Sequence, residues 1–276
     1  MGVVAVSVCM LVGIVFICEI ARKAAVVLLS GRRKGGDRGI YAAEIISTIQ
    51  LCACAHELRL LSEDAPGIAL SLTYVVSVVH ALTFRGAAGN PTALLERYWC
   101  ASVGGTCALL RAACQFAAAA ATGPLMRRAW DFALSELHER HARSGFACAS
   151  PIDDVHALRA AGAELACAFV VHAAATLTRG VEEKYRVHAV AAVITTVVYA
   201  GGSTTGAVFN PALAFSAQFP CSGSTFLKNS LVYWLGPVLG IACSLLLFNK
   251  VSLAFTAKST THKDQNLHAV KKKKRN

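Results

Sequence analysis

Charged residues are scarce in this chain of 276 residues: only 16% are Asp, Glu, Lys or Arg, whereas 55% are hydrophobic. A soluble domain of this size carries about a quarter charged residues, so the composition indicates a membrane protein. The eleven cysteines lack the spacing of zinc ligands, and we expect no metal and no cofactor. No Asn-x-Ser/Thr acceptor, in which x is any residue but Pro, occurs either, so we expect no N-glycosylation.

Seven apolar stretches are of the length needed to cross a bilayer, which takes roughly 20 residues as a helix. They cover about 2–20, 40–61, 67–84, 109–131, 156–177, 187–204 and 229–249. The first is unlike a signal peptide because basic residues follow it instead of preceding it. We interpret it as an extra N-terminal helix that starts on the far side of the membrane.

The net charge of +11 does not indicate a nucleic-acid partner, because about half of the 27 Lys and Arg residues lie in two segments. One is the linker after the first stretch, beginning at Arg22, and the other is the C-terminal tail. By the positive-inside rule both segments lie in the cytosol. The loop at 135–155 is acidic on balance, as expected on the far side, but Arg127 and Arg128 fit this scheme poorly.

An internal repeat appears when the chain is shifted by 120 residues. The shift superimposes Ala43-Glu44 on Ala163-Glu164, Gly86-Ala87 on Gly206-Ala207, and Asn90-Pro91 on Asn210-Pro211. Each half holds three spanning stretches, and an odd number of crossings turns the second half upside down. The sequence therefore predicts an all-α membrane protein built as an inverted repeat.

The expected parts follow from this repeat. They are an N-terminal helix and basic cytosolic linker (1–39), a first half (40–134), a lumenal loop (135–155), a second half (156–249) and a basic cytosolic tail (250–276).

Each Asn-Pro is followed by an apolar piece too short to span, residues 92–98 and 212–218. A single Asn-Pro is usually a turn, but two at equivalent repeat positions indicate half-helices that enter the membrane from opposite faces. Asn is a preferred N-cap and Pro suits the first helical position. Each N-terminus carries about half a positive charge, so the two together would form a pore that opposes cations. The amides of Asn90 and Asn210 would donate hydrogen bonds to a passing neutral solute.

Glu44 and Glu164 lie within spanning stretches, where an unpaired carboxylate is costly. We expect them to accept hydrogen bonds from backbone N–H groups of the two re-entrant loops. The alternative is that one or both lie at the membrane interface near a helix end.

The paired Asn-Pro boxes in an inverted repeat resemble the aquaporin family over residues 40–249. Arg111 with Gln115 also resembles the start of that family's third helix. The resemblance implies six spanning helices, two half-helices, one pore in each subunit, a homotetramer in the lipid bilayer and no enzymatic activity.

Details resemble the superaquaporin branch, the aquaporin-11-like proteins first and the aquaporin-12-like proteins next. The first box is Asn90-Pro91-Thr92, whereas the second is the usual Asn210-Pro211-Ala212. Cys221 stands nine residues after Ala212, as the branch's signature cysteine does. Cys148 lies in the other far-side loop, and a disulfide with Cys221 is possible if that side is oxidising.

Four apolar residues stand where the family places its selectivity filter. Leu213 follows the second box in place of Arg, Val198 takes the position of His, and Ala207 and Leu70 complete the set. Such a filter is less hydrated, so water-only selectivity is in doubt and glycerol and hydrogen peroxide become expected permeants beside water. The branch carries these solutes across intracellular membranes.

The tail ends in Lys271-Lys-Lys-Lys-Arg-Asn276, and Lys273 and Lys274 resemble a dilysine signal for retrieval to the endoplasmic reticulum. A basic tail that touches anionic lipid is the alternative. We expect a multi-pass protein of the endoplasmic reticulum membrane with a cytosolic C-terminus.

We expect a passive channel for water and small neutral solutes. The alternative is a non-conducting or gated membrane scaffold that retains the fold, because Thr92 and a dry filter could close the pore. An intramembrane enzyme using His56, Glu57 and Cys52 or Cys54 is disfavoured, because no set of nucleophile, base and orienting group is visible.

Overall fold

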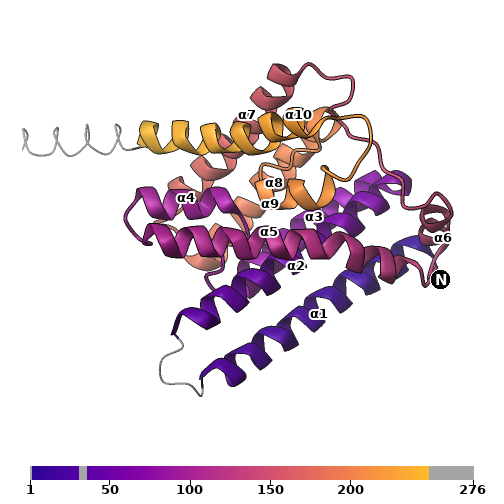
Figure 1. Cartoon of the computed structure of the whole chain (residues 1–276), viewed down its shortest axis with the longest axis horizontal. Coiled ribbons are helices and arrows are strands. Elements are labelled where there is room, and N and C mark those ends of the chain that lie inside the picture. The colour runs from indigo at the N-terminus through magenta and orange to yellow at the C-terminus, as the bar shows by residue number, and fades with distance from the viewer. Residues whose placement is uncertain (1, 31–35, 249–276) are drawn as a thin grey trace, which may run out of the picture.

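The computed structural model describes residues 2–30 and 36–248, and within them the chain is almost entirely helical (Figure 1). The helices are α1 (Val3–Ser30), α2 (Gly36–Asp64), α3 (Pro66–Thr83), α4 (Pro91–Trp99), α5 (Gly105–Trp130), α6 (Glu136–Arg143), α7 (Ala157–Leu177), α8 (Glu183–Thr205), α9 (Pro211–Ala217) and α10 (Phe226–Ser230). A π-helical turn, η1 (Leu231–Leu235), follows α10, and the whole segment Phe226–Phe248, here called the last helix, is one candidate span.

The order of elements repeats as predicted: two long helices, a half-helix and a third long helix make each half. In the first half these are α2, α3, α4 and α5, and in the second they are α7, α8, α9 and the last helix. α3 packs against α8 across the two halves. α5 runs toward the end of the molecule that carries α6, and the last helix runs the opposite way (Figure 1), as an inverted repeat requires.

Within the part of the chain that the structure describes, five helices are long and apolar enough to cross a membrane: α1, α3, α7, α8 and the last helix. The remaining long helices, α2 and α5, carry buried polar side chains instead. These are Glu44, Ser47, Thr48, Gln50 and Glu57 in α2, and Arg111, Gln115 and Thr122 in α5. Polar groups are tolerated within a membrane bundle where they face its interior and find partners. Their burial makes α2 and α5 the interior helices of the first half.

α1 is longer than the expected stretch at 2–20, because it continues to Ser30. Arg22, which we expected in an exposed linker, is instead buried in α1 and donates to Gln50 Oε1 at 2.6 Å. Glu19 pairs with both Arg22 and Arg85. These partners hold the charged turn of α1 against α2 and the end of α3, so a basic residue in an apolar helix is stabilised without water.

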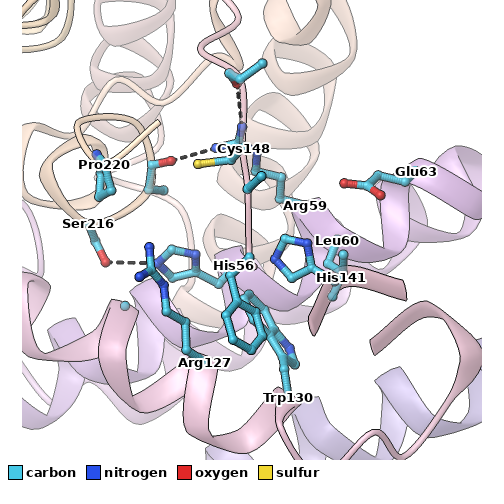
Figure 2. Close-up of a pocket in the computed structure, with 15 residues that line it drawn as sticks. His56, Arg59, Leu60, Glu63, Arg127, Trp130, His141, Cys148, Ser216 and Pro220 are labelled. Carbon is cyan, nitrogen blue, oxygen red and sulfur yellow. Dashed lines mark hydrogen bonds between the residues drawn. The ribbon is translucent and has the colours of Figure 1, made fainter. Parts of the chain in front are cut away.

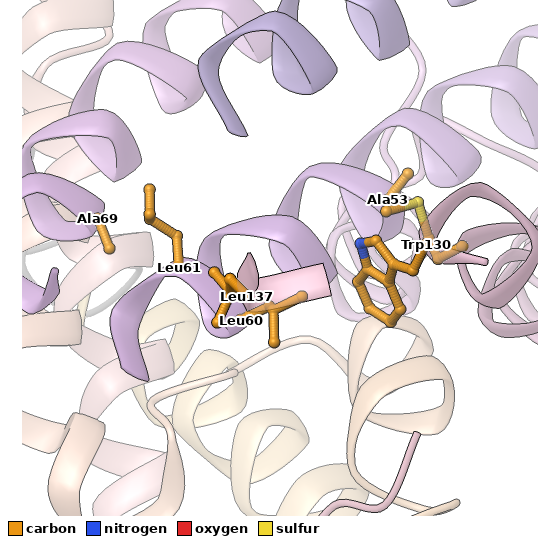
Figure 3. Packing of buried hydrophobic residues seen from close by; sticks show 7 residues of the cluster. Ala53, Leu60, Leu61, Ala69, Trp130 and Leu137 are labelled. Atoms are coloured by element: carbon orange, nitrogen blue, oxygen red, sulfur yellow. The ribbon is translucent and has the colours of Figure 1, made fainter. Parts of the chain in front are cut away.

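One face of α1 packs on the rest of the molecule. Val3, Val4, Met10 and Ile14 lie against a buried cluster built on Leu60, Leu61, Trp130 and Leu137 (Figure 3). Phe16, Ile17, Val27 and Leu28 of the same helix are exposed. Exposed apolar side chains on a helix of this length suit lipid contact.

The segment at 135–155 is more ordered than the loop we expected, because it contains α6. Ser135 caps that helix by accepting from His138 N, and acidic residues stand in its first turn with basic residues in its last, as helix capping and the helix dipole favour. Glu57 of α2 accepts from Trp130 Nε1 at 2.8 Å and lies 3.1 Å from His138 Nε2. This buried contact fixes α6 to the ends of α2 and α5.

Candidate pore

The two half-helices begin at the Asn-Pro boxes. Asn90 Oδ1 accepts from Thr92 N at 3.0 Å, and Asn210 Oδ1 accepts from Ala212 N at 3.0 Å and Leu213 N at 3.3 Å. A proline occupies the start of each helix, where its missing N–H removes no hydrogen bond. Each half-helix therefore has a capped N-terminus, which carries the positive end of the helix dipole.

The two N-termini meet. Asn90 Nδ2 donates to Phe209 O at 3.3 Å, and Asn210 Nδ2 donates to Gly89 O at 2.8 Å. Each asparagine thus caps its own half-helix with its oxygen and holds the opposite loop with its nitrogen. An amide nitrogen carries two N–H groups, so each side chain keeps one donor beyond this bond.

The re-entrant loops adopt backbone conformations that L-residues rarely take. Ala207 has φ 46° and Phe209 has φ 36°, which is costly for residues with a Cβ atom. In the first loop Gly89 has φ 58°, and an added Cβ would lie 3.0 Å from the Phe84 ring. Such loops persist only where surrounding groups hold them.

Glu44 holds the first loop. Its carboxylate accepts from Ala88 N at 2.9 Å and Gly89 N at 3.1 Å, and also from Arg111 Nε at 2.8 Å and Gln115 Nε2 at 2.7 Å. The side chain is fully buried. Arg111 Nη2 also donates to it, so this buried carboxylate accepts five hydrogen bonds and pairs with a guanidinium, which offsets its desolvation cost.

Glu164 holds the second loop with different partners. It accepts from Val208 N at 3.0 Å, Phe209 N at 2.5 Å and Thr205 Oγ1 at 2.5 Å. The Thr205 carbonyl in turn accepts from Tyr233 Oη at 2.8 Å. Within residues 2–30 and 36–248, no cationic side chain pairs with Glu164. Both glutamates therefore bond the loops that the sequence assigned to them, and the part that they play in permeation stays a prediction.

The four filter candidates do not form one group. Ala207 is buried in a cluster with Cys167 and Val197, against which Val198 packs. Leu213 packs instead on a cluster formed by Cys52, Ala119 and Ala212 and on another around Tyr233. Leu70 of α3 is half-buried and belongs to neither cluster. The structure thus joins Val198 with Ala207, and the assignment of all four to a filter stays a prediction.

Arg59 is a contact residue that the sequence analysis missed. From the end of α2, its guanidinium donates to Ala217 O at 2.6 Å, Gln218 Oε1 at 3.3 Å and Ala149 O at 3.0 Å. His56, one turn earlier, lies 3.0 Å from Ser216 Oγ. A charged residue near the end of a polar spanning helix was the signal available in the sequence. Arg59 joins α2, the end of α9 and the loop before α7.

A disulfide joins Cys148 to Cys221, with 4.8 Å between the Cα atoms. The sequence left this pairing open. Ser222 N donates to Cys148 O at 3.0 Å and Ser150 N donates to Ser222 O at 2.8 Å. The two loops therefore run side by side, tied by a covalent bond and by backbone hydrogen bonds next to Arg59.

Other sequence candidates lie elsewhere. Cys52 and Cys54 are fully buried in α2, which leaves the enzyme hypothesis without an accessible thiol. Lys273 and Lys274 lie outside the described residues, so their retrieval role stays a prediction. Across residues 2–30 and 36–248, no group of three His, Cys, Asp or Glu side chains could hold a metal ion.

Comparison with known proteins identifies the family of this chain. A family model described as Major intrinsic protein matches residues 57–248. Aquaporin-11 of Homo sapiens is 39% identical over 212 residues, which cover 76% of this chain and 77% of that protein. Aquaporin-12 of Mus musculus is 34% identical over 249 residues, which cover 88% of this chain and 84% of that protein. The chain belongs to the major intrinsic protein family, the aquaporins, and matches its superaquaporin branch.

Proposed function

We propose that the protein conducts water, glycerol and hydrogen peroxide passively across an intracellular membrane. Its family is one of channels for water and small solutes. The observation that carries the proposal is the meeting of two capped half-helix N-termini, joined by Asn90 Nδ2 to Phe209 O and Asn210 Nδ2 to Gly89 O. The remaining amide donors can bond a neutral solute, and the positive helix ends repel cations.

The choice of permeants rests on the filter candidates. Leu213 stands in place of the family's arginine, whose charge would bind water and restrict the pore. Val198 and Ala207 are apolar. A passage without a charged side chain is less hydrated and less narrow, so it is less restricted to water. Glycerol and hydrogen peroxide are small, neutral and able to use the asparagine donors.

The orientation and location are part of the same proposal. α1 is proposed to cross the membrane, which gives seven crossings with the N-terminus in the lumen and the C-terminus in the cytosol. The first residues of α1 lie at the same end of the molecule as α6, and the C-terminal end of α1 lies at the opposite end (Figure 1). The dilysine-like tail supports the endoplasmic reticulum, and family resemblance supports a homotetramer.

The test is flux in proteoliposomes under a glycerol gradient, followed by light scattering. Shrinkage reports water leaving and re-swelling reports glycerol entering, and both should exceed empty vesicles. Peroxide entry is then measured with an enclosed peroxide-sensitive dye. Folded protein that accelerates none of the three would overturn the proposal and favour the non-conducting or gated scaffold.

Two substitutions locate the flux in the proposed pore. Asn210→Asp keeps the oxygen that caps α9, removes the donor to Gly89 O and adds negative charge, so we expect all fluxes to fall by about tenfold or more. Leu213→Arg should reduce glycerol flux and spare water flux, because it restores a bulky cation at the filter candidate. Equal fluxes in wild type and Asn210→Asp would place the conduction elsewhere.

A further inference from the structure

A second site lies away from the asparagine boxes. A cavity of about 330 Å³ opens between the ends of α2 and α5, the loop at 141–149 and the residues that end α9 (Figure 2). None of the pore candidates lines this cavity, and neither does any residue of α3, α4 or α8. The cavity is therefore separate from the place where the two half-helix N-termini meet.

Most of the charged and titratable side chains that line the cavity are basic. Arg59 and His56 come from α2, Arg127 from α5 and His141 from α6, and the one carboxylate among the lining residues is Glu63. Figure 2 shows His56, Arg127 and His141 gathered below the loop that carries Cys148. An excess of guanidinium over carboxylate groups in a partly enclosed space attracts anions.

The arginines are not neutralised within the described structure. Arg59 bonds two backbone carbonyls and an amide oxygen through its two Nη atoms. These bonds do not cancel its charge, and among residues 2–30 and 36–248 its Nε–H has no hydrogen-bond partner. Arg127 has neither a hydrogen bond nor an ion pair to any residue among 2–30 and 36–248. A guanidinium at a cavity wall with five free donors is a ready partner for an oxyanion.

The electrostatic environment of His141 agrees with a cavity that carries excess positive charge. Burial lowers the pKa of His141, with Glu63 acting in the opposite direction and Arg59, His138 and Arg127 adding to the lowering. At neutral pH the imidazole is therefore neutral and can donate one hydrogen bond. Trp130 and Phe146 supply an apolar wall, which suits an organic remainder attached to the anion.

We propose that this cavity binds a phosphate group, held between Arg127 and Arg59. A tetrahedral oxyanion offers enough acceptors for two guanidinium forks and the neighbouring imidazole, more than a carboxylate does. The group can come from a soluble phosphate monoester or from a lipid headgroup, because the cavity opens where the spanning helices α2 and α5 end.

Phosphate binding is tested by thermal unfolding of the full chain in phosphatidylcholine nanodiscs, titrated with inorganic phosphate at constant ionic strength. A ligand of the folded state raises Tm in a saturable manner. Arg127→Gln should weaken the apparent Kd by about tenfold or more, since it removes a charged hydrogen-bond partner. Glu63→Gln should tighten binding because it removes the opposing charge.

Arg128→Gln is the matched control, because Arg128 is the next residue on α5 and does not line the cavity. It removes the same charge and should leave the titration unchanged. Arg127→Gln breaks no hydrogen bond or ion pair in the described structure, in contrast to Arg59→Gln, which removes three hydrogen bonds to oxygen. The readout does not involve permeation and stands whether or not the channel conducts.

The proposal would be overturned if wild type showed no Tm rise with either inorganic phosphate or phosphatidic acid, or if the rise were equally large in Arg127→Gln. A second series in nanodiscs that contain phosphatidic acid separates the two sources. Stabilisation that appears only with phosphatidic acid, and is lost in Arg127→Gln but kept in Arg128→Gln, would assign the phosphate to a lipid headgroup.

Discussion

The two halves of the repeat hold their re-entrant loops with the same residue but with different chemistry. Glu44 is paired with the buried guanidinium of Arg111 and with Gln115. Glu164 at the equivalent position is bonded by the Thr205 hydroxyl and two backbone N–H groups. One half uses an ion pair and the other a network of neutral donors. The repeat therefore preserves the position of the acceptor but leaves its partners to the surrounding helices.

Replacement of Glu44 by Gln should have the largest effect. The change leaves Arg111 buried without its carboxylate, and breaking a buried pair in this way costs about 3–5 kcal/mol. We expect a large loss of folded protein, measured as Tm and as the monodisperse fraction in detergent. The double variant Glu44→Gln with Arg111→Gln should recover part of the loss because it removes the orphaned charge. A single variant as stable as wild type would show that the ion pair does not hold the first loop.

Loss of the disulfide should cause the second-largest loss of stability, and this loss should concern the second half alone. Cys221 follows α9 and is bonded to Cys148, whereas Cys100 follows α4 and is free and exposed. Replacing both Cys148 and Cys221 by Ser should cost about 2–4 kcal/mol, as removal of a disulfide usually does. The measurement is Tm with and without reductant. Cys100→Ser is the matched control and should leave Tm unchanged, and an equal drop in both variants would contradict the asymmetry.

Replacement of Glu164 by Gln should have a smaller effect than the change at Glu44. The amide oxygen still accepts on one side, but the amide nitrogen cannot, so at least one donor of the loop loses its acceptor. No buried cation is left unpaired, and the cost is that of an unsatisfied donor, about 1–3 kcal/mol. The comparison of Tm in Glu44→Gln and Glu164→Gln, measured side by side, tests the asymmetry directly. A larger drop at Glu164 would reverse the assignment of the ion pair as the stronger support.

The substitution Thr92→Ala should have the smallest effect, because it converts the first box into the second. The Thr92 hydroxyl donates to Asn90 Oδ1 at 2.7 Å, next to the cap bond from Thr92 N. Its loss removes one hydrogen bond, about 0.5–1.5 kcal/mol, and leaves the cap in place. Water flux in proteoliposomes should be retained. A flux that rises several-fold would show instead that Thr92 restricts the pore.

The local signals in the sequence predicted most of the fold. Six apolar stretches correspond to the long helices of the two halves, since helix length and hydropathy are local properties. The Asn-Pro boxes gave the starts of α4 and α9 because an N-cap followed by Pro is a local signal too. α6 was missed, since a polar helix of eight residues has little apolar periodicity. The length of α1 was missed because its charged turn is buried by partners far away in the chain.

The sequence by itself determined the inverted repeat, the half-helix starts and the two acceptor glutamates, because residue type, spacing and periodicity encode them directly. Only the tertiary structure decided which partner each glutamate takes, that Cys148 pairs with Cys221, and that Arg59 and Arg127 line one cavity. These contacts join residues far apart in sequence, and packing brings them together across different helices. A single sequence carries no signal of such distances, because most buried polar groups take their partners from whichever helices pack against them.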